Sequence, residues 1–133
     1  MYDITKIQVL VVDDNDFMRD LVASMLREIG FREIAHAADG EAALAKVKEV
    51  EPGLILCDVD MEPMNGLDFV EQLRRHAPPP PTPQIPVILL TAKVHAHDRH
   101  PFADLAVAGV IAKPFDPLTL ADHVADTLRR ARE

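Results

Sequence analysis

The chain has 133 residues, 48% of them hydrophobic and 27% charged, a balance typical of one globular domain with a sizeable core. Its formal net charge of −8 argues against nonspecific binding to nucleic acid and against binding to anionic membranes. The single cysteine excludes an internal disulfide, and no apolar stretch reaches the roughly 18 residues of a membrane-spanning helix, so we expect a cytoplasmic protein without membrane insertion.

In the first half of the chain, apolar runs of strand length alternate with amphipathic stretches of helix length. The sequence predicts strands at residues 7–12, 32–38 and 53–57. It predicts helices over residues 17–30, from the N-cap candidate Asp39 onwards, and over residues 67–76. The apolar face expected for the first of these helices is formed by Phe17, Leu21, Met25 and Ile29, with Val22 beside them.

The second half continues the alternation after a proline-rich interruption. Residues 77–86 contain six prolines, which predicts a stiff surface loop. Strands are predicted at 87–90 and 109–112, with a short helix around 101–108 between them. The closing helix is expected to begin with Asp116 as N-cap and Pro117 at the first helical position. Its predicted apolar face comprises Leu118, Ala121, Ala125 and Leu128.

Five strands that alternate with helices predict an α/β fold. Such a (βα)5 chain is doubly wound: a parallel sheet is covered by helices on both faces, which gives a three-layer sandwich. We expect residues 1–133 to form one domain. In open parallel sheets, binding sites form at the carboxyl ends of the strands, so the residues that follow each strand are the candidates for function.

Charged and polar residues stand at four of these five strand ends. They are Asp13 and Asp14 after the first strand, Asp58 after the third, Thr91 after the fourth and Lys113 after the fifth. Carboxylates that share a cleft repel one another and need a cation, and Mg²⁺ suits oxygen ligands. Thr91 and Lys113 can neutralise phosphoryl oxygens while one carboxylate acts as nucleophile. The pattern predicts phosphoryl transfer to an aspartate.

The motifs around these residues resemble the response-regulator receiver domain, in particular its single-domain chemotaxis type. The matching segments are VLVVDDND (9–16), HAADGEAAL (36–44), LILCDVDMEPMNGLDF (54–69), LLTAK (89–93) and GVIAKPF (109–115). The resemblance covers about residues 5–131. It implies a flavodoxin-like fold with strand order 2-1-3-4-5, an order that we take from the family rather than from the residues.

The resemblance also implies roles for individual residues. Asp58 corresponds to the phosphoacceptor. Asp14, Asp58 and the backbone carbonyl of Asp60 correspond to direct Mg²⁺ ligands, and Asp13 to a ligand that acts through water. The implied phosphodonor is a histidine kinase or a histidine phosphotransfer protein.

Further implied features concern the other side of the site. Lys113 would bridge Asp58 and the phosphoryl group, and Thr91 would close on that group after transfer. In the family the Lys113–Pro114 bond is commonly cis. Ala92, a small residue beside the site, would leave the acyl phosphate reachable by water. Output would pass to a downstream protein target, because we expect neither an output domain nor direct DNA binding.

The sequence departs from the family pattern at several positions. Val110 stands where the family usually has an aromatic residue, so the aromatic switch is absent or replaced and the output route is open. The proline of MEPM (61–64) comes one place late, with Asn65-Gly66 expected to supply flexible backbone. We hypothesise that Asp60 and Lys93 pair above the site and shield the phosphoryl group from water.

Other interpretations of the same residues remain open at this point. LILCDVDM also resembles the nucleophile motif of haloacid-dehalogenase-type phosphatases, although that motif usually lies on the first strand. A receiver-like scaffold that is not phosphorylated is the other alternative to a signalling module that is not an enzyme. Asp13 can also be read as a helix cap, with Asn15 and Asp16 as further candidates, and Cys57 as a core residue. The loop histidines His95, His97 and His100 match no closed zinc site.

Overall fold

The computed structural model describes residues 3–62, 64–76, 84–92 and 107–131. Five parallel strands form one sheet in the order β2-β1-β3-β4-β5. The strands are β1 Gln8–Val12, β2 Glu33–Ala37, β3 Leu54–Asp58, β4 Val87–Thr91 and β5 Gly109–Ala112. The helices are the 3-10 turn η1 Ile4–Lys6 and the α-helices α1 Asp16–Ile29, α2 Gly40–Val50, α3 Gly66–Arg75 and α5 Pro117–Ala131. The predicted doubly wound fold and its strand order are confirmed.

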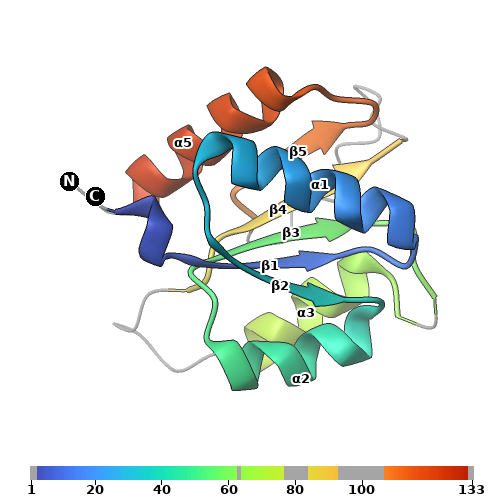
Figure 1. The fold of residues 1–133 in the computed structure, drawn as a ribbon. Helices are drawn as coiled ribbons and strands as arrows, with labels where there is room; N and C mark the ends of the chain where they lie inside the picture. Colours follow the sequence, from blue (N-terminus) through green and yellow to red (C-terminus); the bar gives the residue numbers. More distant parts are fainter. Residues whose placement is uncertain (1–2, 63, 77–83, 93–106, 132–133) are drawn as a thin grey trace.

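The helices cover both faces of the sheet, as Figure 1 shows. Helices α1 and α5 lie on one face and α2 and α3 on the other. Side chains alternate along each central strand, so that Val9 and Val11 of β1 join the core beneath α1 and α5. Leu10 and Val12 join the core beneath α2 and α3. Because both faces of β1, β3 and β4 are buried, these strands read as continuous apolar runs in the sequence.

Each described α-helix begins at a polar side chain that accepts a backbone N–H. Asn15 caps α1 through an N–H···O bond from Met18 (3.0 Å), and Asp39 caps α2 through one from Ala42 (2.8 Å). At α3 and α5 the bonds run from Asp68 to Asn65 and from Thr119 to Asp116, each 2.8 Å. The predicted caps at Asp39 and Asp116 are therefore confirmed, and these caps fix where each helix leaves the loop that precedes it.

The predicted apolar faces of α1 and α5 are right only in part: Val22, Met25 and Leu128 are buried as expected, but other predicted residues are exposed. In α1 the buried residues are Val22, Ala23, Met25 and Leu26, whereas Phe17 is 75% exposed and Leu21 39% exposed. In α5 the buried residues are Leu120, Val124, Thr127 and Leu128, whereas Leu118 is 77% exposed. In both helices, the large apolar residues that the prediction placed wrongly lie in the first two turns.

Some predictions fall on residues that are not described. They include the short helix around 101–108 apart from its last two residues, the three loop histidines, Lys93 and most of the proline-rich loop. The described end of that loop, Gln84–Pro86, is irregular as expected. Among the residues that the structure describes, no helix combines the length and apolar character needed to cross a membrane.

Candidate functional site

Backbone hydrogen bonds extend the sheet beyond its strands and place the candidate side chains. The Asp13 N–H donates to the Ala37 carbonyl (3.1 Å), which continues the pairing of β1 with β2. The Lys113 N–H donates to the Thr91 carbonyl (2.8 Å), which continues the pairing of β5 with β4. Asp13, Asp58, Thr91 and Lys113 therefore project from one rigid edge of the sheet, at the carboxyl ends of its strands.

Three carboxylates gather at this edge. Asp13, Asp14 and Asp58 each offer an oxygen, and these oxygens all lie within 4.8 Å of one another. Asp13 is 1% exposed and Asp58 5% exposed, whereas Asp14 is open to solvent. The cluster is therefore half embedded in the sheet, with one ligand at its mouth. Hard oxygen donors at this spacing, accessible from one side, have the chemistry that a divalent cation such as Mg²⁺ requires.

Lys113 is the positive charge of the cluster. Its Nζ lies 3.1 Å from Oδ1 of Asp58 and 3.5 Å from Oδ2 of Asp13, and its side chain is only 17% exposed. A largely buried ion pair is costly to break, because one removed partner leaves the other charge uncompensated. Lys113 therefore joins the ends of β1, β3 and β5 into one charged unit.

The ionisation of Asp58 is set by opposing influences. Burial raises the pKa of the Asp58 carboxyl, and the charge and hydrogen bond of Lys113 offset part of that rise. The nearby Asp13 raises the pKa further, while a backbone hydrogen bond from Asp60 lowers it. The net direction is upward, so the Asp58 carboxylate is held in a site that favours its neutralisation, by a proton or by a cation.

The loop after β3 closes tightly on the Asp58 backbone. The Gly66 N–H donates to the Val59 carbonyl (2.9 Å), and a Cβ added to Gly66 would lie 2.4 Å from the Asp58 carbonyl oxygen. Only glycine fits this close approach. The sequence had suggested flexible backbone at Asn65-Gly66. The structure shows instead that Asn65 caps α3 and that Gly66 permits close contact with the end of β3.

The remaining candidates take up positions around the cluster. Thr91 ends β4 and is 1% exposed, and Asp60 is exposed just beyond β3. The Lys113–Pro114 bond is cis, as the resemblance implied. Asp13 is not the cap of α1, since Asn15 holds that position and donates its own N–H to Oδ1 of Asp13 (2.9 Å).

Cys57 is a core residue, as predicted. It is fully buried with the side chains beneath α2 and α3. Burial raises the pKa of the Cys57 thiol, and its Sγ donates to the Asp58 carbonyl at 3.3 Å. A protonated, enclosed thiol of this kind does not act as a nucleophile.

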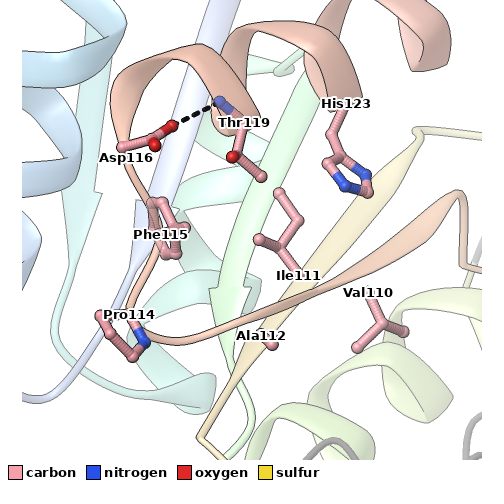
Figure 2. Close-up of a pocket in the computed structure, with 8 residues that line it drawn as sticks. All are labelled: Val110, Ile111, Ala112, Pro114, Phe115, Asp116, Thr119 and His123. Atoms are coloured by element: carbon pink, nitrogen blue, oxygen red, sulfur yellow. Dashed lines mark hydrogen bonds between the residues drawn. The ribbon is translucent and has the colours of Figure 1, made fainter.

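A surface pocket of about 580 Å³ lies beyond Lys113, between β5 and α5 (Figure 2). Its walls are Val110, Ile111, Ala112, Pro114, Phe115, Asp116, Thr119 and His123. Figure 2 shows Pro114 and Asp116 at one end and His123 with Val110 at the other. Asp13, Asp14 and Asp58 do not line it, so the pocket and the carboxylate cluster are separate features joined through the loop 113–116.

One contact at the site was not foreseen from the sequence. Arg19 of α1 donates from Nη1 to the backbone carbonyl of Asp13 at 2.7 Å. Its side chain is 14% exposed, and Nη2 pairs with Asp16. The Asp16–Arg19 spacing of three residues was the only signal for it, and that spacing is common on exposed helix faces.

Comparisons with known proteins agree with this geometry. The family model for the response regulator receiver domain matches residues 9–125. The probable transcriptional regulator ycf27 of Cyanophora paradoxa is 34% identical over 96% of this chain and 51% of its own length. The DNA-binding response regulator MtrA of Mycolicibacterium smegmatis is 33% identical over 96% of this chain and 53% of its own. The chain thus spans about half the length of these curated relatives.

Solved structures are similar along nearly the whole chain. The chemotaxis protein CheY4 of Vibrio cholerae matches with a TM-score of 0.75 and 30% identity, covering 94% of this chain and 98% of that one. A putative response regulator from Chloroflexus aurantiacus matches with a TM-score of 0.82 and 29% identity, covering 92% and 98%.

Proposed function

The chain belongs to the response regulator receiver domain family, and from that premise we propose that Asp58 accepts a phosphoryl group from a histidine kinase or a histidine phosphotransfer protein. Receiver domains are signalling modules of two-component systems rather than enzymes with an external substrate. The observation that carries the proposal is the 3.1 Å contact of Lys113 with Asp58 inside a cluster of three carboxylates.

The proposed cofactor is Mg²⁺, held by Asp14, Asp58 and the backbone carbonyl of Asp60, with Asp13 acting through water. The donor set fits, because the three carboxylates offer oxygens within 4.8 Å of one another and Asp14 opens the cluster to solvent. When bound, Mg²⁺ would supply positive charge against the phosphoryl oxygens. Lys113, already paired with two of these carboxylates, offsets only one of the three negative charges, so the cluster still needs a cation.

In the proposed reaction, a carboxylate oxygen of Asp58 attacks the phosphorus of a phosphohistidine. An O–P bond forms, the N–P bond breaks, and the leaving imidazole takes up a proton. Lys113 then bridges Asp58 and a phosphoryl oxygen, and the Thr91 hydroxyl donates to another phosphoryl oxygen. Water later cleaves the acyl phosphate and restores the Asp58 carboxylate. A shift between two conformations would carry the signal to a protein target.

The surface around the site offers a place for the phosphodonor to dock. Among the described residues, the exposed large hydrophobics are Phe17, Leu21 and Leu118. Phe17 and Leu21 lie four residues apart on one face of α1, whose first turn follows Asp14, and Leu118 lies in the first turn of α5. Phe17 and Leu118 lie in helix turns that begin at the carboxyl edge of the sheet, and Leu21 lies one turn further along α1. We propose that they contact the donor protein.

If the donor protein docks on this surface, a substitution there should slow phosphotransfer from a protein donor but not from a small-molecule donor. Phe17→Asp is expected to slow phosphotransfer from the cognate kinase at least tenfold, because a buried aromatic contact is typically worth more than 1 kcal/mol at an interface. The rate with acetyl phosphate should stay within twofold of wild type. Equal slowing with both donors would show that the substitution damages the site rather than the docking surface.

Other parts of the proposal concern the setting of the domain. Because the net charge is −8, we expect residues 1–133 themselves not to bind DNA, whatever the longer relatives do. We also propose a cytoplasmic location and a single receiver domain over these residues. Shielding of the phosphoryl group by Asp60 and Lys93 stays a prediction: Lys93→Ala should speed loss of phosphate.

The experiment that tests the function is Mg²⁺-dependent phosphorylation by acetyl phosphate, followed by intact-protein mass. One phosphate adduct is expected with Mg²⁺, none with a chelator, and none on Asp58→Asn. A phosphatase of the haloacid-dehalogenase type would instead hydrolyse a phosphate monoester with steady turnover and accumulate no adduct. A chain without adduct and without turnover, tested also with its kinase, would be a scaffold, and the proposal would be wrong.

A further inference from the structure

Arg19 links helix α1 by a hydrogen bond to the peptide unit between Asp13 and Asp14, two of the three carboxylate residues. Its Nη1 donates to the Asp13 carbonyl at 2.7 Å. That carbonyl lies in the same peptide plane as the N–H and Cα of Asp14, because the bond between them is planar. Holding the carbonyl therefore orients the start of Asp14 as well as the end of Asp13.

The Asp13 residue is fixed from four directions. Its N–H donates to Ala37 (3.1 Å), and its carbonyl accepts from Arg19. Its Oδ1 accepts from the Asn15 N–H (2.9 Å), and its Oδ2 pairs with Lys113 (3.5 Å). Three of these contacts come from strand or loop neighbours at the edge of the sheet. Arg19 alone reaches this residue with a side chain from α1.

The position of the Arg19 guanidinium is energetically unfavourable in two respects. Its side chain is 14% exposed, and its Nε is buried without a hydrogen-bond partner among the described residues. A buried donor without an acceptor lowers the stability of the folded chain. Its positive charge also stands close to a cluster that needs a cation. The hydrogen bonds that Nη1 and Nη2 donate must offset both the unpaired Nε and the repulsion between the guanidinium and a bound cation.

We propose that Arg19 is a positioning residue for the metal site: it fixes the Asp13–Asp14 peptide unit so that both carboxylates face one cation. The inference rests on the proposed function, since it takes these carboxylates as the Mg²⁺ ligands. Arg19 itself touches neither the cation nor the phosphoryl group in this scheme.

The direction in which Mg²⁺ affinity changes distinguishes a positioning role of Arg19 from an effect of its charge. Replacing Arg19 by Gln removes a positive charge near a cation site, and charge alone would then tighten Mg²⁺ binding. Loss of positioning would weaken it, and outer contacts of metal ligands are typically worth about tenfold or more in affinity. We expect the Mg²⁺ dissociation constant of Arg19→Gln to rise about tenfold.

The experiment is a Mg²⁺ titration of the unphosphorylated chain, followed by the amide signals of Asp14 and Asn15 in NMR spectra. Arg27→Gln is the matched control, because it removes the same charge from an exposed residue in the last turn of α1 and should leave the affinity unchanged. Unchanged or tighter binding by Arg19→Gln would overturn the inference. A wild-type chain that shows no Mg²⁺ saturation would instead overturn the proposed function.

A second variant covers the case in which Arg19→Gln does not fold. Arg19→Lys keeps the charge and the aliphatic stem, but one ammonium cannot replace two guanidinium nitrogens that reach Asp13 and Asp16. Its Mg²⁺ affinity should fall at unchanged net charge. Wild-type affinity in a folded Arg19→Lys chain would overturn the inference.

Discussion

The carboxylate cluster and the pocket between β5 and α5 are neighbours built in opposite ways. In the cluster, charged groups from three strands are largely buried and held by contacts of 2.7–3.5 Å. The pocket is open and lined by both apolar and polar side chains, and Val110 contributes a small side chain to its wall. The loop 113–116 connects the two regions, since it carries Lys113 at one end and Asp116 at the other. The carboxylate cluster is therefore held by tight contacts, whereas the pocket has room for side chains to move.

The largest effect that this comparison predicts is on Lys113, where the two regions meet. Lys113→Met should lower the rate of phosphorylation by acetyl phosphate about 100-fold, because the phosphoryl group loses its fixed positive partner. The measurement is the rate of adduct formation by intact mass at saturating Mg²⁺. Lys48→Met, on an exposed part of α2, is the control and should react like wild type. A Lys113→Met rate within threefold of wild type would remove Lys113 from the reaction.

Two glycine-to-alanine substitutions test how closely the backbone is packed in the two regions. Gly66→Ala should lower the free energy of unfolding by about 3 kcal/mol, because its Cβ would lie 2.4 Å from the Asp58 carbonyl oxygen. Gly109→Ala, at the start of β5, should change it by less than about 1 kcal/mol, since the nearest atom lies 3.9 Å away. Urea denaturation measures both. Similar losses for the two variants would contradict the difference in packing.

A smaller effect follows from the pKa of Asp58. Because burial raises that pKa in the folded chain, the contribution of Asp58 to stability is fully present below its unfolded pKa and is lost as pH rises through the folded pKa. At neutral pH without Mg²⁺, Asp58→Asn should therefore be more stable than wild type by about 1 kcal/mol. The gain should shrink as the pH is lowered. Asp122→Asn, exposed on α5, should show neither change.

The smallest effect is expected in the pocket. Val110→Phe adds an aromatic ring to an open wall, so the rate of phosphorylation by acetyl phosphate should stay within about twofold and the stability within about 0.5 kcal/mol. Adduct formation and thermal unfolding measure the two. A tenfold change in rate would mean that the pocket and the carboxylate cluster are coupled more strongly than their separate linings indicate.

The sequence predicted the fold and the gathering of the site residues for a simple reason. Apolar runs mark buried strands, and the carboxyl ends of parallel strands share an edge, so Asp13, Asp58 and Lys113 had to meet. The rotation of each helix about its own axis and the distances between atoms at the site were not predictable from the sequence. The predicted apolar faces of α1 and α5 wrongly included Phe17 and Leu118, because an apolar residue type does not reveal which side of a helix the residue occupies.

Two contacts at the site also escaped prediction. The approach of Gly66 to Asp58 and the hydrogen bond from the Arg19 side chain to Asp13 both end on backbone carbonyl oxygens, which sequence spacing does not reveal. Both lie around β3 and the carboxylates rather than in the core. Residues that set distances at a site are therefore the ones for which coordinates add most to the sequence.

The central claim, that Asp58 accepts the phosphoryl group, is tested most directly by locating the adduct. Borohydride reduces an aspartyl phosphate to homoserine, so treatment after reaction with acetyl phosphate and Mg²⁺ marks the acceptor for peptide mass spectrometry. In wild type we expect homoserine at position 58 and at neither 13 nor 14. Homoserine at another aspartate, or an unmodified Asp58 in a chain that carries the adduct, would contradict it.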